Sequence, residues 1–231
     1  MAAHDKMHRS LFIFLSAAVL CGAAPARAAD DYSPAERALF MSDQLADLRP
    51  PAAIHYRFVK RGSLEPGFDD RATLEVRRRA DGSCCAARSD FLSGAHRVSL
   101  PEVEQAEGNP VLLYFLERDI HEMSRLTHGQ ANYFRKRIRM AIYQGAHISD
   151  ITLAYRGHRV AARRITISPY LDDPLRARFE QLATKRYDFI LSDAVPGDIV
   201  AITTLVAGAG GAAPVLSEQL VLDGAVVPGD P

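Results

Sequence analysis

Residues 109–129 read NPVLLYFLERDIHEMSRLTHG, and this stretch separates two groups of predicted β-strands. Asn109 and Pro110 are typical of the first residues of a helix, and Gly129 is typical of the position that follows a helix end. The pattern therefore predicts a helix that begins at Pro110 and runs to about Leu126.

One face of this predicted helix is apolar, and its first part is apolar all round. The stripe consists of Leu112, Leu116, Ile120 and Met123, and Leu113 widens it. Because Val111 to Leu116 is apolar on every side, this part is expected either to be buried or to cover a ligand. Glu117 and His121 stand four residues apart on one face, but the HExxH motif is absent, so we expect no metal site here.

Apolar and polar residues alternate on both sides of the helix, as expected for antiparallel strands with one wetted face. In the first group the apolar positions are Ile54, Tyr56, Phe58, Ala72, Leu74 and Val76. Asp81-Gly82 predicts a tight turn into a strand over residues 83–92, and another strand is expected at about residues 95–100. The second group is expected over residues 151–155, 159–170, 187–191, 198–206 and 215–223.

A further helix is expected before the first strand. Ser33 and Glu36 form a capping box around Pro34, and Pro50-Pro51 ends the helix. Its apolar stripe is Met41, Leu45 and Leu48.

Two more segments are helix candidates. Residues 131–143 place Phe134, Ile138 and Ala141 on one side of a helix, but Ile138, Met140 and Ile142 also alternate as in a strand, so both interpretations stay open. A short helix is expected after Asp172 or Asp173, with Pro174 in its first turn.

These elements predict an α+β fold, because strands and helices do not alternate as they do in a parallel α/β sheet. About nine strands are expected in one strongly curved, half-barrel-like antiparallel sheet. The N-terminal helix and an inserted helical pair are the available cover for its apolar face. We expect a single domain over residues 29–223 and a disordered tail over residues 224–231.

The first 28 residues have the pattern of a cleaved signal peptide. Lys6 and Arg9 precede a ten-residue apolar run, and Ala26-Arg27-Ala28 supplies the small residues of a cleavage site. The run is shorter than the roughly 20 residues that span a bilayer. We therefore expect a soluble protein in a bacterial periplasm. Cys21 raises the alternative of a lipid anchor, which the large residue Leu20 before it disfavours.

Charge and cysteine content exclude some classes of protein. The chain has 28 basic and 28 acidic residues, and loss of residues 1–28 leaves 25 against 27, so a nucleic-acid binder is not expected. Cys84 and Cys85 are the cysteines that remain, too few for a disulfide scaffold and without the partners of a zinc site. They are expected on a strand, either reduced, joined to each other, or bridging two chains.

The order of these features resembles the LolA/LolB-like periplasmic carriers. The phrases that carry the resemblance are ATLEVRRRADGS (72–83) with DFLSGAHRVSLPE (90–102), and GHRVAARRITISPY (157–170) with KRYDFILSD (185–193). The resemblance implies a half-barrel whose concave apolar face receives acyl chains. It supplies no signature residues, and the basic segment YFRKRIRMAIYQ (133–144) has no counterpart in those carriers.

The sequence thus predicts a non-enzymatic periplasmic carrier for an apolar or amphiphilic ligand, a lipid or a lipidated protein, held against the sheet and gated by the inserted helix. The expected ligand-binding residues are Tyr56, Phe58, Leu74, Val76, Leu112, Leu113, Leu116, Ile120 and Met123. The expected contacts to a lipid headgroup or a membrane-associated protein are Arg135, Lys136, Arg137 and Arg139. No cofactor and no catalytic residue are expected, since no nucleophile motif or phosphate loop is present.

Two alternatives remain open. The first is an assembly factor that binds a protein partner through the basic segment and has no small ligand. The second is a hydrolase or metal enzyme that would need Glu117, His121 or other polar residues to converge in a cleft.

Overall fold

The computed structural model of the protein describes Met1 and residues 32–228, and within residues 32–228 it contains one nine-stranded antiparallel sheet. Three strands precede the helical pair of residues 111–144: β1 (Ala52–Arg61), β2 (Phe68–Arg77) and β3 (Ala86–Phe91). Six follow them: β4 (His147–Tyr155), β5 (His158–Ile167), β6 (Arg186–Leu191), β7 (Ile199–Val206), β8 (Leu216–Leu222) and β9 (Ala225–Val226). The predicted signal peptide, apart from Met1, lies outside the described residues.

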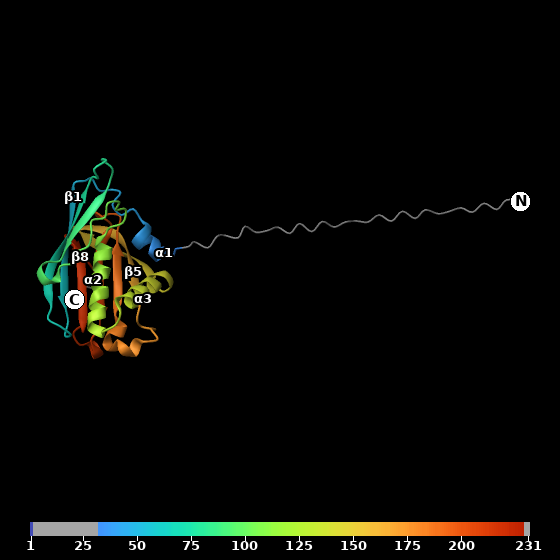
Figure 1. The fold of residues 1–231 in the computed structure, drawn as a ribbon, viewed down its shortest axis with the longest axis vertical. Coiled ribbons are helices and arrows are strands. Elements are labelled where there is room, and N and C mark those ends of the chain that lie inside the picture. Colours follow the sequence, from blue (N-terminus) through green and yellow to red (C-terminus); the bar gives the residue numbers. More distant parts are fainter. Residues whose placement is uncertain (2–31, 229–231) are drawn as a thin grey trace. The chain divides into compact units, whose positions relative to one another are not determined.

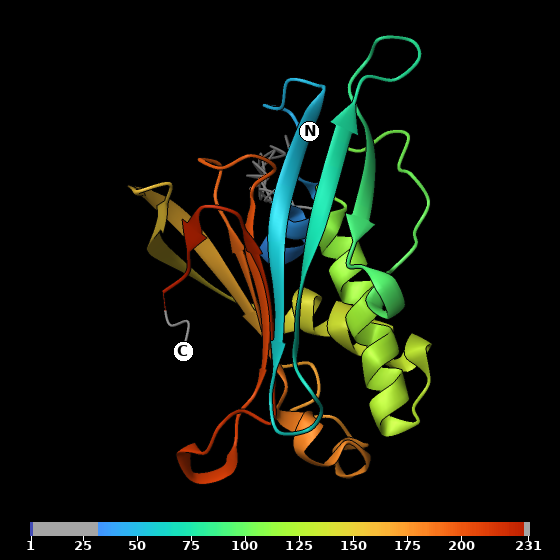
Figure 2. The same ribbon diagram turned by 90° about the vertical axis from the view of Figure 1, so that its left-hand side faces the viewer.

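The strand order is β3-β2-β1-β8-β7-β6-β5-β4-β9, so the first three strands continue the meander formed by the later ones. Pairing of β1 with β8, with Tyr56 opposite Leu222, joins the two groups. β3 and β9 are the edges, and the sheet stays open. The helices α2 (Val111–Thr127) and α3 (Ala131–Gln144) cover one face of the curved sheet (Figures 1 and 2). This confirms the predicted α+β class and the curved sheet covered by an inserted helical pair.

The ninth strand is not the one that the sequence predicted. Residues 95–100 form no strand: a 3₁₀ turn, η2 (Gly94–His96), is followed by a single bridge between Phe91 and Val98. Gly94 has a positive φ of 51°, which breaks the extended conformation that a strand needs. The chain therefore meets β3 only at isolated bridges, at Val98 and again between Val103 and Ala87.

The predicted disordered tail also needs correction over residues 225–228. Ala225 and Val226 form β9 and pair with β4, because β4 would otherwise present an unpaired edge. Val227 is buried, and the Arg164 Nη2 atom donates a hydrogen bond to the Pro228 carbonyl oxygen at 3.2 Å. Residues 229–231 lie outside the described residues.

The leading helix begins as predicted but ends early. The Ser33 Oγ atom accepts from the Glu36 N–H at 3.1 Å, and the Glu36 carboxylate accepts from the Ser33 N–H at 2.8 Å, which completes the capping box. α1 (Pro34–Glu36) passes into a π-helical turn, η1 (Arg37–Met41), and stops there. The predicted extension to residue 48 is wrong, because the Gln44 side chain donates to the Ala38 carbonyl oxygen and so closes the helix end.

Of the two remaining helix candidates, one is a helix in the structure and the other is not. Residues 131–144 are helical, since Phe134, Ile138 and Ile142 recur every four residues and are all buried. The short helix expected after Asp173 is replaced by two 3₁₀ turns, η3 (Arg176–Arg178) and η4 (Glu180–Thr184), because Glu180 has a positive φ that interrupts a continuous helix.

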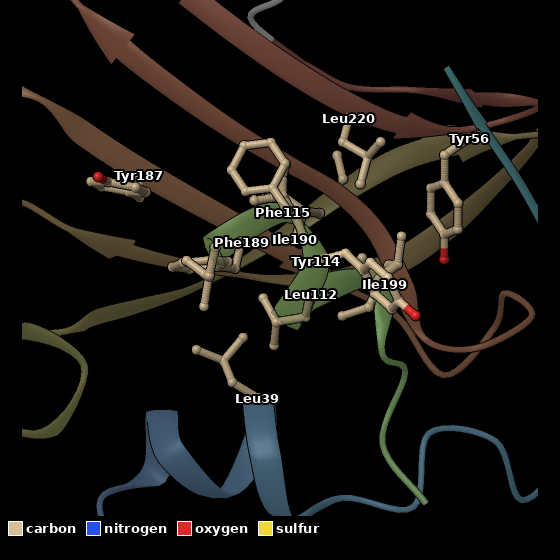
Figure 3. Close-up of a cluster of buried hydrophobic side chains, with 14 of the residues drawn as sticks. Leu39, Tyr56, Leu112, Tyr114, Phe115, Tyr187, Phe189, Ile190, Ile199 and Leu220 are labelled. Carbon is tan, nitrogen blue, oxygen red and sulfur yellow. The ribbon is translucent and has the colours of Figure 1, made fainter. Parts of the chain in front are cut away.

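The core lies between the sheet and the helices. Figure 3 shows Leu112 and Phe115 of α2 in one cluster with Phe189 of β6 and Leu220 of β8, while Leu39 of η1 closes the cluster from the other side. No helix within residues 32–228 is long and apolar enough to span a membrane.

Candidate functional site

The structure divides the nine residues expected to bind a ligand into two groups. Six of them are at most 1% exposed and belong to the core between the sheet and α2: Tyr56, Phe58, Leu74, Val76, Leu112 and Met123. Their side chains pack against one another and against Phe115, so α2 itself occupies the space in which the ligand was expected. The other three, Leu113, Leu116 and Ile120, line a cavity among the helices.

This cavity has a volume of about 510 Å³ and is walled by η1, α2 and α3; we call it the interhelical groove. Its apolar lining consists of Tyr32, Phe40, Met41, Leu100, Leu113, Leu116, Ile120, Ile138 and Ile142. A hydrogen bond of 3.2 Å from the Ser33 Oγ atom to the Ile142 carbonyl oxygen joins α1 to α3. The walls of the interhelical groove are therefore connected by direct contacts.

Large apolar side chains at the interhelical groove remain open to solvent. Tyr32, Phe40, Met41 and Leu113 are 48%, 40%, 54% and 53% exposed. Met41 was predicted to share one apolar stripe with Leu45, but η1 ends at Met41, and its side chain is exposed whereas Leu45 is buried. Exposed apolar residues that gather at one place are typical of a binding surface, whereas isolated ones are ordinary.

Charged residues stand at the rim of this groove. The Arg135 guanidinium lies 2.6 Å from the Glu117 carboxylate, and the His121 Nε2 atom lies 3.1 Å from the same carboxylate. Arg139 also lines the groove, and neither the Arg139 nor the Lys136 side chain has a hydrogen bond or ion pair within residues 32–228. The structure thus brings Arg135 and Arg139 to the apolar residues.

The other two expected cationic contacts lie outside the lining of the groove. Lys136 is exposed one position further along α3. The Arg137 Nε atom lies 2.6 Å from the Asp173 carboxylate, which is fully buried, so Arg137 fixes the segment after β5 to α3. Arg137 therefore has a structural partner and is not available to a headgroup.

Behind α2 lies a group of charged side chains that sequence analysis did not identify. The Asp119 carboxylate bonds to the Lys185 ammonium and accepts a hydrogen bond from the Tyr187 hydroxyl at 2.6 Å. Glu218 lies 3.7 Å from Lys185 and 2.9 Å from the Arg118 guanidinium. We call Arg118, Asp119, Lys185 and Glu218 the buried charge network.

Burial and pairing act in opposite directions on the two carboxylates of this network. Burial raises the pKa of Asp119 above its ordinary value, and its bonds to Lys185 and Tyr187 offset this only in part. Burial also acts to raise the pKa of Glu218, but attraction to Lys185 and Arg118 prevails and lowers it. Asp119, Lys185 and Glu218 are 0% exposed, so in this conformation they contact only protein.

A second charge cluster holds the C-terminal half of α2 at the end of the sheet where β1 turns into β2. Lys60 of β1 lies 2.9 Å from Glu65 and 2.5 Å from Glu122, and Arg125 lies 2.6 Å from Glu65 and 3.0 Å from Glu122. Burial opposes ionisation of Glu122, yet hydrogen bonds from Arg125 and Lys60 outweigh it and lower its pKa to about 2. We call these four residues the edge charge network.

Glu117 and His121 converge on no third ligand. Within residues 32–228 no group of three or more His, Cys, Asp or Glu side chains could hold a metal ion. Cys84 and Cys85 are joined to each other by a disulfide in the segment that leads into β3, and so they lie before the strand rather than on it.

Comparison with known proteins identifies no family for this chain. No protein family model matches the sequence, and no curated protein matches it. Among solved structures, the chain is similar to the lipoprotein LppX of Mycobacterium tuberculosis, with 12% identity and a TM-score of 0.31. That match covers 78% of this chain and 90% of LppX.

Proposed function

We propose that this protein is an exported, non-enzymatic binding protein for an amphiphilic molecule, a lipid or the lipid part of a lipidated protein. The ligand lies in the interhelical groove, not between α2 and the sheet. The observation that carries the proposal is an apolar groove of about 510 Å³ with four large, exposed apolar side chains. Sites for small molecules have volumes of about 300–1,000 Å³ and mainly apolar walls.

The lining suits a ligand with an apolar part and a charged part. Phe40, Met41 and Leu113 offer a surface for an acyl chain, and burial of apolar area contributes roughly 25 cal/mol for each Å² removed from water. Arg139 stands beside this surface without a carboxylate partner in the described residues. A purely apolar ligand would leave the Arg139 guanidinium without a hydrogen-bond acceptor, whereas a headgroup oxygen can accept its hydrogen bonds.

The sequence predicted a ligand held against the sheet under a movable α2. The two charge networks make that movement of α2 unfavourable. To open α2 away from the sheet, Arg118 and Asp119 would have to separate from Glu218 and Lys185. A buried ion that loses its partner costs about 3–5 kcal/mol. The interhelical groove needs no such movement, because it is already open to solvent.

The test uses a fluorescent fatty acid whose emission rises in an apolar site. Titration into the purified protein is expected to give saturable binding, and native mass spectrometry of gently purified protein is expected to show a lipid-sized adduct. Leu113→Asp is expected to weaken the binding of the probe at least tenfold, because it replaces a groove-lining side chain worth about 1.5–3 kcal/mol of burial by a charge.

Leu171→Asp is the matched control, because Leu171 is also an exposed leucine but does not line the interhelical groove. It is expected to bind the probe like the wild type. Absence of saturable binding by the wild type, or equal loss in both variants, would rule out the groove as the site.

A further inference from the structure

We infer that the face of the protein that carries the interhelical groove docks on an anionic lipid bilayer, from which the groove receives its ligand. This inference rests on the proposed function for the transfer of the ligand, although docking itself is a separate property. The occupant of the surface is a membrane rather than a second protein, because the face combines exposed apolar residues with cations that outnumber its carboxylates.

Exposed apolar side chains are concentrated on this face. Tyr32, Phe40, Met41 and Leu113 all line the interhelical groove, although they come from two separate segments of the chain. Tyr143, which is 47% exposed on α3, adds a second tyrosine. Tyrosine is enriched where proteins meet the headgroup layer of a bilayer, because its ring is apolar and its hydroxyl is polar.

Cations border the apolar residues along one side of α3. At 3.6 residues per turn, Lys136, Arg139 and Tyr143 fall in adjacent positions on the exposed side of this helix. Arg139 is shared with the wall of the groove, and Lys136 lies beside it, further from the groove. A helix with cations next to apolar residues is the arrangement that lies on anionic membrane surfaces.

The carboxylates of the groove do not cancel this charge. Glu117 pairs with Arg135, whereas Glu36 accepts only the neutral Ser33 N–H and keeps its negative charge. Within residues 32–228 the side chains of Arg139 and Lys136 have no partner, and Arg135, Lys136 and Arg139 together outnumber Glu36 and Glu117, so the net charge of the groove and its border is +1. A positive rim around apolar residues favours an anionic bilayer over a zwitterionic one, by about fivefold for each Lys or Arg near the surface.

Docking in this orientation gives the ligand a short path. The acyl chain leaves the bilayer directly into the open side of the interhelical groove and is not exposed to water. Arg139 then meets the headgroup at the level of the phosphates, and the apolar residues of η1 and α2 face the acyl region. One face therefore serves both for contact with the membrane and for binding.

The experiment measures flotation of the full protein with lipid vesicles. Vesicles of phosphatidylglycerol and phosphatidylcholine are compared with vesicles of phosphatidylcholine alone. Binding is expected to the anionic vesicles and to fall steeply in about 1 M salt, where the Debye length is about 3 Å. Lys136→Glu changes the charge by two units and is expected to lower partition about 25-fold.

Arg159→Glu is the matched control, because Arg159 is an exposed arginine on the β4–β5 hairpin, away from α3. It is expected to leave partition within about twofold, and both variants are expected to bind the fluorescent fatty acid in the absence of vesicles. Equal binding to both kinds of vesicle, or equal loss in both variants, would overturn the inference.

The two proposals fail in different ways. A wild type that binds the fatty acid but ignores anionic vesicles overturns docking and leaves the proposed function standing. A wild type that floats with anionic vesicles but does not bind the fatty acid supports docking and removes the groove as a ligand site.

Discussion

The two halves of α2 contact the rest of the protein by different physical means. From Val111 to Leu116 the contacts to the sheet are apolar, whereas from Arg118 to Arg125 they include two networks of ion pairs. Apolar contact is favourable over a wide range of positions because it has no preferred direction. Ion pairs fix one register, because each charge that misses its partner remains buried and unpaired. The first half contributes burial, and the second half fixes the position of the helix.

The position of α2 matters for function because this helix separates the core from the interhelical groove. Leu113, Leu116 and Ile120 face the groove, while Phe115 and Met123 are fully buried. A rotation of α2 by one residue would bury different side chains and change the lining. The charge networks therefore maintain the groove although they do not line it.

The largest effect is expected for Lys185→Met. This change leaves Asp119 buried without its cation and should lower the free energy of unfolding by about 3–5 kcal/mol, measured by urea denaturation. Adding Asp119→Leu to the variant should recover most of the loss, because an apolar pair of similar size replaces the ion pair. If the single change proves neutral, the C-terminal half of α2 is not held by charge and the comparison fails.

An intermediate effect is expected for Glu122→Gln, and it depends on pH. The pKa of Glu122 is lowered to about 2 in the folded protein, so its contribution to stability is present above its unfolded pKa of about 4.5 and is lost as pH falls toward 2. At pH 7 the variant should be less stable by about 1–2 kcal/mol, a value reduced for partial exposure.

Urea denaturation at pH 7 and at about pH 3 measures this difference. The wild type and the Glu122→Gln protein should be closer in stability at the lower pH. If the wild type and the variant differ in free energy of unfolding by the same amount at both pH values, the edge charge network acts through the shape of its side chains rather than their charge.

The smallest effect on stability is expected for Leu113→Asp. Leu113 belongs to the apolar half of α2 but is 53% exposed, and an acidic residue in the first turn of a helix is favoured by the helix dipole. The free energy of unfolding should change by no more than about 0.5 kcal/mol. A large loss would place Leu113 in the core and would make its effect on ligand binding uninterpretable.

Local patterns in the sequence predicted most of the strands and the start of α2, while residues 131–143 stayed open between helix and strand. Alternation over residues 54–58 and 72–76 corresponds to β1 and β2, and the capping box at Ser33 marks α1. These signals are readable because each depends on neighbours within a few residues. The β9 strand was missed because two residues carry no pattern, and they are extended only where the edge of β4 is available.

The sequence contains a signal for the buried charges, because two acidic residues stand at positions that face the core. Asp119 stands on the apolar stripe of its helix, one position before Ile120. Glu218 lies between Leu216 and Leu220 on the same inward-facing side of its strand. A charged residue at an inward position predicts a buried partner. What the pattern cannot supply is the identity of that partner, because Lys185 is 66 residues from Asp119 and meets it only when α2 packs on the sheet.

By itself, the sequence determined the class of fold, the curved sheet and the amphipathic character of α2, because hydrophobic periodicity follows directly from the geometry of strands and helices. Tertiary structure alone decided that α2 fills the concave face and that the open apolar surface lies among the helices. The reason is that an apolar side chain has no preferred partner until the chain has brought competing surfaces together. Leu112 and Leu113 are identical neighbours in the sequence, and only their directions in the folded protein make one a core residue and the other a residue of the groove.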